Sequence, residues 1–264
     1  MARYVPERAD DFVFENNLVC GRIYGQALEG NPTSPGVDIW VKLPGALVAN
    51  EWYRHFSEEG NESYYHHDHG GKDCYKVGTS LGGGASVPYV DGKFCYPATN
   101  YRESEIICQD SEKLTFKLVY PEWDANGIKV KLEKTITVYP DTYFCKVEDC
   151  YTGDFESLEI IAGVWRHEDR NIGAEQSWND RFAIWEHASD QSVEREDGML
   201  GLAVYMPEAE NCFVASDGRL NHSLCSKKVT SGESLVYWFG SCWSKGDIST
   251  PEKWFELVSS LQNK

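Results

Sequence analysis

Apolar and polar residues alternate one by one through most of the middle and the second half of the chain. In IKVKLEKTITVY, residues 128–139, every second position from Ile128 to Leu132 is apolar, and charged residues stand between them. Successive side chains of a β-strand point to opposite faces, so this spacing predicts a strand with one buried face. The same alternation predicts further strands at residues 113–120, 142–152, 158–165, 182–189, 199–206, 211–216 and 233–243.

Turn-forming residues separate these strands at short intervals. They are ANG at 125–127, YPD at 139–141, TGD at 152–154, SDG at 216–218 and SGE at 231–233. Connections this short join strands that run antiparallel. Many antiparallel strands with little helix predict an all-β fold, either a sandwich or a barrel.

One stretch, STPEKWFELVSSL at the C-terminus, has a clear helical pattern. Ser249 or Thr250 can cap the helix, and Pro251 suits its first position. The apolar residues between Trp254 and Leu261 recur at helical spacing and form one stripe. We expect this C-terminal helix to lie against the outside of a sheet.

The remaining chain gives fewer signals of its organisation. Residues 46–56 predict a second, shorter helix, whereas residues 57–104 carry little regular pattern. A compact domain rarely keeps so much irregular chain unless that chain is functional. No repeat, low-complexity tract or Pro/Gly linker divides residues 1–264, so we predict a single β-sandwich domain.

Charge limits the range of partners. Lys and Arg total 25 against 42 Asp and Glu, for a net charge of −17. Nucleic acids and anionic membrane surfaces need a basic footprint, so we expect neither as a partner. No run of 18 apolar residues is present, which predicts no membrane insertion. The first residues, MARYVPERADDF, lack the apolar stretch of a secretion signal.

Several common catalytic motifs are missing from the sequence. It contains no P-loop, no dinucleotide fingerprint, no GxSxG and no HExxH. These absences argue against nucleotide-dependent transfer, α/β-hydrolase chemistry and zinc proteolysis. The nine cysteines form no CxxC pair, so they predict no zinc-type ligand spacing.

Residues 64–78, YYHHDHGGKDCYKVG, gather many titratable side chains around glycines. His69 is a candidate acid or base near neutral pH, and Lys76 can bind a carboxylate. Tyr75 can donate a hydrogen bond or stack on a sugar. The alternative is a polar surface loop without a role.

The same segment also suggests a metal site. His66, Asp68 and His69 offer imidazole and carboxylate ligands close together. Nothing elsewhere in the sequence supplies a firm fourth ligand. We therefore expect no cofactor, with a metal ion at these three residues as the open alternative.

Two predicted strand ends carry further candidates. VWRHEDR, residues 164–170, places Arg166 and His167 where an apolar strand leaves the core, and AIWEHAS places Glu186 directly after Trp185. An imidazole beside carboxylates can act as an acid, and Arg166 can neutralise a uronate. Trp165 and Trp185 can stack on sugar faces. The plainer alternatives are a salt-bridge cluster and structural packing.

Four segments resemble a known family. They are SPGVDIWVKLPG, YYHHDHGGKDCYKVGTSLGGGAS, DTYFCKVEDCYT and YWFGSCWSKGD, and the resemblance runs over nearly the whole chain. The family is bacterial and fungal and is known as domain of unknown function 4861. It implies a galactose-mutarotase-like supersandwich associated with the breakdown of pectin-like and other uronate-bearing polysaccharides. It also implies export, for example to the periplasm.

On this resemblance we expect a carbohydrate-active enzyme that acts on a sugar or a uronic-acid-containing oligosaccharide. In a lyase, His69 or His167 would be the base, Arg166 or Lys76 the cation, and Tyr75 the acid.

A mutarotase or hydrolase would instead pair His167 with Glu186 as acid and base. His66 and Asp68 would help to bind the substrate. The alternative from another class is a non-catalytic carbohydrate-binding module, which would use Trp165, Trp185 and Trp40 as stacking platforms.

Overall fold

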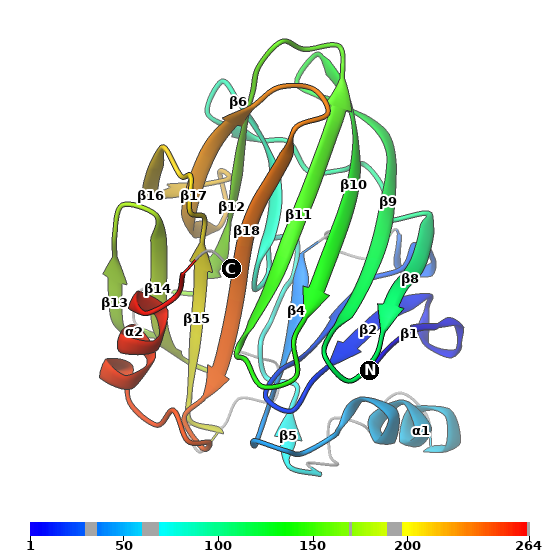
Figure 1. Cartoon of the computed structure of the whole chain (residues 1–264), viewed down its shortest axis with the longest axis vertical. Coiled ribbons are helices and arrows are strands. Elements are labelled where there is room, and N and C mark those ends of the chain that lie inside the picture. Colours follow the sequence, from blue (N-terminus) through cyan, green and yellow to red (C-terminus); the bar gives the residue numbers. More distant parts are fainter. Residues whose placement is uncertain (30–35, 60–68, 169–170, 189–196, 263–264) are drawn as a thin grey trace.

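The computed structural model describes residues 1–29, 36–59, 69–168, 171–188 and 197–262. These residues form three sheets and two α-helices (Figure 1). The helices are α1 (Ala49–Glu59) and α2 (Pro251–Ser259), with two short 3-10 helices at Pro6–Arg8 and Gln26–Leu28.

The largest sheet has eight strands. In spatial order they are β13 (Ile172–Ser177), β14 (Arg181–His187), β15 (Met199–Tyr205), β18 (Ser234–Trp243), β11 (Phe144–Gly153), β10 (Ile128–Val138), β9 (Leu114–Ala125) and β8 (Glu103–Gln109). The outer strands β8 and β13 are largely exposed.

Two five-stranded sheets complete the strands. One runs β16 (Asn211–Ser216), β17 (Asn221–Val229), β12 (Leu158–Arg166), β6 (Ala85–Val90) and β7 (Lys93–Phe94). The other runs β1 (Ala2–Val5), β2 (Asp11–Glu15), β3 (Cys20–Ile23), β4 (Val37–Lys42) and β5 (Gly71–Lys72). The pairings of these named strands are antiparallel.

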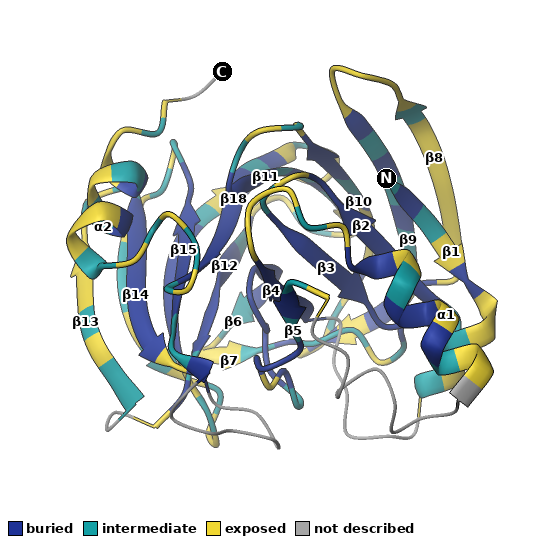
Figure 2. Ribbon diagram, turned by 90° about the horizontal axis from the view of Figure 1, so that it is seen from below, coloured by how far each residue is buried: buried dark blue, intermediate teal, exposed yellow. Residues whose placement is uncertain are grey.

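Both smaller sheets pack on the same large sheet, which makes the fold a sandwich (Figure 2). Strand β12 contacts β15, β17 contacts β14 and β15, and β4 contacts β18. Phe12 of β2 stacks on Phe116 of β9 with ring centroids 4.5 Å apart. Burying apolar side chains between sheets is the main stabilisation of such a fold.

The C-terminal helix lies against the large sheet, as the sequence predicts. Trp254 of α2 is fully buried, stacks on Phe144 with centroids 5.4 Å apart and donates to the carbonyl of Leu202. The Thr250 side chain accepts a hydrogen bond from the Lys253 backbone and caps the helix. Neither helix of the described chain is long and apolar enough to cross a bilayer.

The structure confirms the all-β antiparallel sandwich with a C-terminal helix, and it confirms each strand predicted by alternation. The predicted ANG turn has Asn126 at φ 53° and Gly127 at φ 95°, as a tight hairpin requires. Residues 57–104 are more regular than their sequence indicates, because β5, β6, β7 and the start of β8 fall within them.

Candidate functional site

A buried histidine and a buried glutamate from different sheets meet where their strands end. His167 directly follows β12, and Glu186 lies near the end of β14. His167 Nδ1 is 2.6 Å from Glu186 Oε1, and the His167 backbone N–H donates to Oε2 at 3.4 Å. Glu186 is 0% exposed and His167 6%. A carboxylate buried this deeply needs hydrogen bonds or an opposite charge, and His167 can supply both.

The second ring nitrogen of His167 is also engaged. Nε2 lies 3.0 Å from the backbone carbonyl oxygen of Lys76. Carboxylate and carbonyl oxygens accept hydrogen bonds, so both contacts are satisfied when each ring nitrogen carries a hydrogen. The arrangement therefore suits an imidazolium held between Glu186 and the backbone of Lys76.

Tyr75 packs against the same ring from inside the protein. Its ring lies edge-on to His167 with centroids 5.1 Å apart, and its hydroxyl donates to the carbonyl of Trp165 at 3.5 Å. Burial, reinforced by the Glu186 carboxylate, raises the pKa of Tyr75 well above its ordinary value. The phenol therefore stays protonated and serves as a hydrogen-bond donor.

Lys76 combines a fixed backbone with an exposed side chain. His167 holds its carbonyl, whereas its ammonium reaches the surface and forms no ion pair with any described residue. Four residues earlier, Lys72 pairs with Asp197 at 2.7 Å. Lys76 thus contacts the buried pair through its carbonyl and has an exposed side chain.

Arg166 points to the other face of its strand. It forms an ion pair with Glu175 of β13 and lies 3.5 Å from the hydroxyl of Ser223. A guanidinium that already has a carboxylate partner is less available to a second anion. Arg166 therefore neighbours His167 in the sequence, but its guanidinium forms its ion pair with Glu175.

The three tryptophans proposed as stacking platforms are buried. Trp165 is 8% exposed and packs on His167 with ring centroids 3.9 Å apart, and Trp185 is 4% exposed. Trp40 is packed between Trp52, 4.9 Å away between ring centroids, and Tyr53 at 5.5 Å. None of the three exposes a ring face to solvent. Their role as stacking platforms for a sugar stays a prediction.

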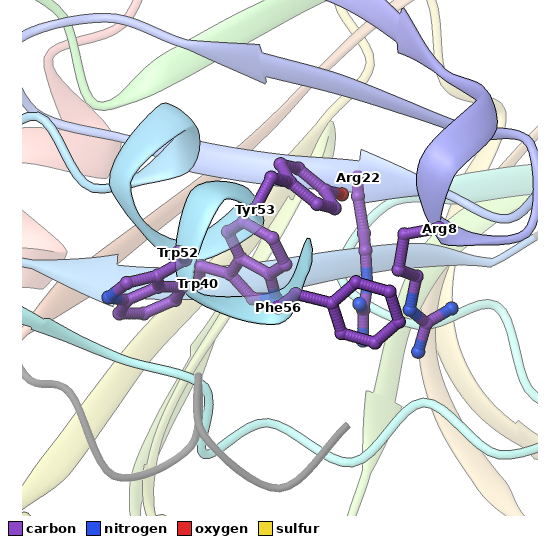
Figure 3. Close-up of a pocket in the computed structure, with 6 residues that line it drawn as sticks. All are labelled: Arg8, Arg22, Trp40, Trp52, Tyr53 and Phe56. Carbon is purple, nitrogen blue, oxygen red and sulfur yellow. The ribbon is translucent and has the colours of Figure 1, made fainter. Parts of the chain in front are cut away.

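Two of the pockets among the described residues involve other side chains. One lies under α1 and is lined by Arg8, Arg22, Trp40, Trp52, Tyr53 and Phe56 (Figure 3). The other is a groove beside α2, lined by Tyr139, Thr142, Phe144, Trp238, Ser260, Leu261 and Gln262. Neither is lined by His167 or Lys76.

His69 lies in a different environment from Tyr75 and Lys76. Its Nε2 is 3.2 Å from Nε2 of His55, and Glu51 of the same helix lies close by. The described residues 69–78 therefore contribute to two places, with His69 beside α1 and Lys76 beside the His167–Glu186 pair. His66 and Asp68 fall outside the described residues.

Sequence reasoning missed four partners of these groups: Glu51, His55, Glu175 and Asp197. Glu51 and His55 are four residues apart in a stretch predicted as helix, so their shared face was a readable signal. Glu175 and Asp197 meet their partners across loops, which no spacing in the sequence reveals.

The fold and the site define an antiparallel β-sandwich protein with a buried His–Glu pair at the ends of strands from two sheets. The chain belongs to the family described as a domain of unknown function, DUF4861, whose model matches residues 1–264. The resemblance seen in the sequence is thereby confirmed. "Uncharacterized protein P7" of Formosa agariphila is 29% identical over 280 residues, covering 100% of this chain and 67% of that protein.

Similar solved structures include sugar-active enzymes. A putative aldose 1-epimerase from Klebsiella pneumoniae gives a TM-score of 0.44 at 9% identity, covering 94% of this chain and 82% of its own. A galactose mutarotase related enzyme from Lactobacillus acidophilus gives 0.35 at 9%, covering 88% and 97%. A heparinase III gives 0.36 at 10%, covering 92% and 36%. At these identities and TM-scores the likeness carries no argument about what this chain does.

Proposed function

We propose that this protein is a carbohydrate-active enzyme that uses acid–base chemistry on a sugar or oligosaccharide carrying a uronic acid. The observation that supports it most directly is the position of His167, held between the buried Glu186 carboxylate and the Lys76 carbonyl. A histidine oriented by a buried carboxylate is a common arrangement for proton transfer.

The Lys76 carbonyl occupies the position that a substrate oxygen would take. It lies 3.0 Å from Nε2 of His167, within the range for proton transfer. When a glycosidic or ring oxygen replaces this carbonyl, His167 donates its Nε2 proton to that oxygen. Glu186 keeps the Nδ1–H bond throughout and stabilises the charged ring before the transfer. Protonation of an oxygen is a step shared by elimination, hydrolysis and mutarotation.

Lys76 supplies the preference for an acidic sugar. The whole chain carries a net charge of −17 and therefore repels uronates at a distance. A ligand carboxylate needs a local cation, and the exposed side chain of Lys76 belongs to the residue whose carbonyl contacts the proposed proton donor. Binding energy from this ion pair holds the reacting oxygen near His167.

A specific observation favours a second candidate, the non-catalytic carbohydrate-binding module. Both ring nitrogens of His167 already have partners, and such a pair also serves as a purely structural link between β12 and β14. In that case a sugar binds without being changed.

The test is turnover on matched panels of neutral and uronic oligosaccharides. Ultraviolet absorbance reports unsaturated elimination products, reducing-end assays report hydrolysis, and polarimetry reports mutarotation. We expect turnover on an acidic substrate by one of these readouts. Replacing His167 with Gln should lower kcat by about 100-fold or more, the usual contribution of a general acid.

Lys76→Ala separates binding from chemistry. Removal of the ammonium should raise KM for acidic sugars by about tenfold, the effect of one charge-assisted contact, and leave neutral sugars unaffected. Lys131→Ala on the exposed face of β10 is the matched control. Binding without turnover across the whole panel would replace the enzyme with the binding module.

A further inference from the structure

We propose that Glu51, His55 and His69 form a binding site for one divalent cation of the zinc type. This site is separate from the His167–Glu186 pair and does not depend on the proposed function. The one-carboxylate, two-imidazole set comes from α1 and from the turn that precedes β5.

The ligand atoms already converge. One atom from each of the three side chains lies within 4.8 Å of the others. The Nε2 atoms of His55 and His69 are 3.2 Å apart, and Glu51 Oε1 is 3.4 Å from His55 Nε2. Two ligands of a tetrahedral zinc ion, each about 2.0–2.1 Å from the metal, are separated by roughly 3.3 Å. Both measured separations match this value.

The two imidazole rings point their nitrogens inward. Their centroids are 5.1 Å apart with an interplanar angle of 18°, whereas their Nε2 atoms are 3.2 Å apart. The nitrogen edges are therefore nearer to each other than the ring centres. In two neutral rings this contact is a hydrogen bond in which one Nε2 donates and the other accepts, and a metal ion would take the place of the shared hydrogen.

Both supports of the site are anchored. Glu51 and His55 share one face of α1, whose first backbone N–H groups at Val48 and Ala49 are bonded by the buried Glu15 carboxylate. His69 has φ 40° and begins a turn whose next carbonyl, that of Gly70, accepts from Leu43 at 2.7 Å. Ligands on anchored backbone need little reorganisation to bind a metal.

A cationic group already lies at this point. The Arg54 guanidinium is 2.5 Å from Glu51 Oε1 and 3.1 Å from His55 Nε2, and it also bonds Glu58. Its side chain is 46% exposed, so it can move toward Glu58 and leave Glu51 to a metal. Arg54 thus acts as a competitor for the same ligands. Removal of Arg54 should therefore strengthen metal binding, whereas removal of a ligand should weaken it.

The ligand types select the class of metal. Two imidazoles and one carboxylate suit zinc and neighbouring transition metals, whereas calcium and magnesium prefer oxygen ligands alone. Three protein ligands would leave the fourth position of a tetrahedral ion to a water molecule or another ligand. A metal here would tie α1 to the start of β5.

The experiment is calorimetric titration of the untagged, chelator-treated protein with Zn²⁺, and with Co²⁺ as the spectroscopic probe. We expect one ion per chain, tetrahedral cobalt absorption without a thiolate band, and a rise in Tm of several degrees at saturation. Outer partners of metal ligands are worth about 10- to 100-fold in affinity, so His55→Gln, His69→Gln and Glu51→Gln should each weaken binding by at least about 100-fold.

Two further variants make the result specific. Arg54→Ala should tighten Zn²⁺ binding by about fivefold or more, since one unit charge roughly 4 Å away costs about 1 kcal/mol even in water. His187→Gln, on an exposed histidine at the end of β14, should change nothing. No Zn²⁺ binding by the wild type, or equal affinity in His69→Gln, overturns the site. Unchanged or weaker binding in Arg54→Ala does so as well, because the guanidinium would then support the ligands.

Discussion

His222 is a histidine that the fold keeps uncharged. Its ring is completely buried, with Nδ1 3.1 Å from the carbonyl of Leu220 and Nε2 accepting from the backbone of Leu81. Phe94 lies against it with ring centroids 5.0 Å apart. Burial lowers the pKa of His222 to about 4 from its ordinary 6.5. In the neutral ring Nδ1–H donates to Leu220 and Nε2 accepts from Leu81, so both contacts are satisfied. A proton on Nε2 would remove the acceptor that the Leu81 N–H uses.

The first residue-scale prediction follows from this shift. Because the folded pKa is depressed, the contribution of His222 to stability is complete above pH 6.5 and is lost as the pH falls to about 4. The loss amounts to roughly 3 kcal/mol. Urea unfolding at pH 7 and pH 4.5 should show a smaller acid loss in His222→Gln than in the wild type. The variant His187→Gln, at an exposed histidine, is the control. An equal loss of unfolding free energy between pH 7 and pH 4.5 in all three proteins would contradict the prediction.

The sequence gives little information about which buried polar residues contact each other. His167 and Glu186 are both candidates from the sequence, because His167 stands beside carboxylates at a predicted strand end and Glu186 directly follows Trp185. Their contact at 2.6 Å joins residues from two sheets, and their separation along the chain gives no sign of it. The turn that carries His69 toward α1 was equally invisible, since its φ of 40° depends on the surrounding structure.

At the scale of elements, α1 depends on one buried carboxylate. Glu15 of β2 bonds the backbone N–H groups of Val48 and Ala49 and pairs with Lys42 at 3.0 Å. A negative charge at a helix N-terminus stabilises it. Both Glu15 and Lys42 are buried, so the ion pair and the cap are lost together when Glu15 changes.

We expect Glu15→Gln to lower the free energy of unfolding by about 3–5 kcal/mol, the range for breaking a buried ion pair. Urea unfolding measures this loss. The matched control is Glu105→Gln on exposed β8, whose pair with Lys117 should contribute less than about 1 kcal/mol. A similar small change in both variants would mean that Lys42 finds another partner.

Alternation predicted β-strands well where only one face of the strand is buried. In β10, alternation holds from Ile128 to Leu132 and resumes at Ile136 and Val138, and the buried positions largely follow it. In β14 it failed as a guide, because α2 covers one face and β17 the other, so Glu186 is buried although alternation opposes it to Trp185. A strand covered on both sides keeps no polar face for the sequence to reveal.

At the scale of the molecule, a polar cluster lies between the sheets. Lys134 of β10 is 2.6 Å from Asp149 of β11, which also accepts from Ser86 of β6. Tyr237 of β18 donates to the carbonyl of Gly84 at 3.0 Å, just before β6. These contacts connect the eight-stranded sheet with the sheet that carries β12. They therefore fix the relative position of the two sheets.

Asp149→Asn should lower the free energy of unfolding by about 3–5 kcal/mol, because Lys134 is left buried without a full counter-charge. Replacing both residues together, Lys134→Met with Asp149→Leu, should recover most of that loss. Urea unfolding of the single and double variants measures the coupling between them. Equal losses in both would show that packing, and not the ion pair, holds the sheets.

The overall architecture was largely predictable, and the positions of its sheets were not. Alternation indicates how many residues a strand takes, and a short turn such as ANG pairs neighbouring strands, but strands distant in sequence, such as β11 and β18, give no sign of their pairing. The N-terminal strands from Ala2 to Lys42 show this, since their nearly complete burial removes the alternating pattern. The placement of α1 depends on them, as does the metal site proposed on it.

The two outermost strands of the large sheet bear on how copies of the molecule meet in solution. β8 presents Glu103 and Glu105 to water, and β13 presents Glu175. If two copies paired edge to edge through their outermost strands, these carboxylates would come close together. Their like charges would then repel before backbone hydrogen bonds could form. Repulsion between these charges at the β8 edge thus disfavours growth of the sheet beyond eight strands.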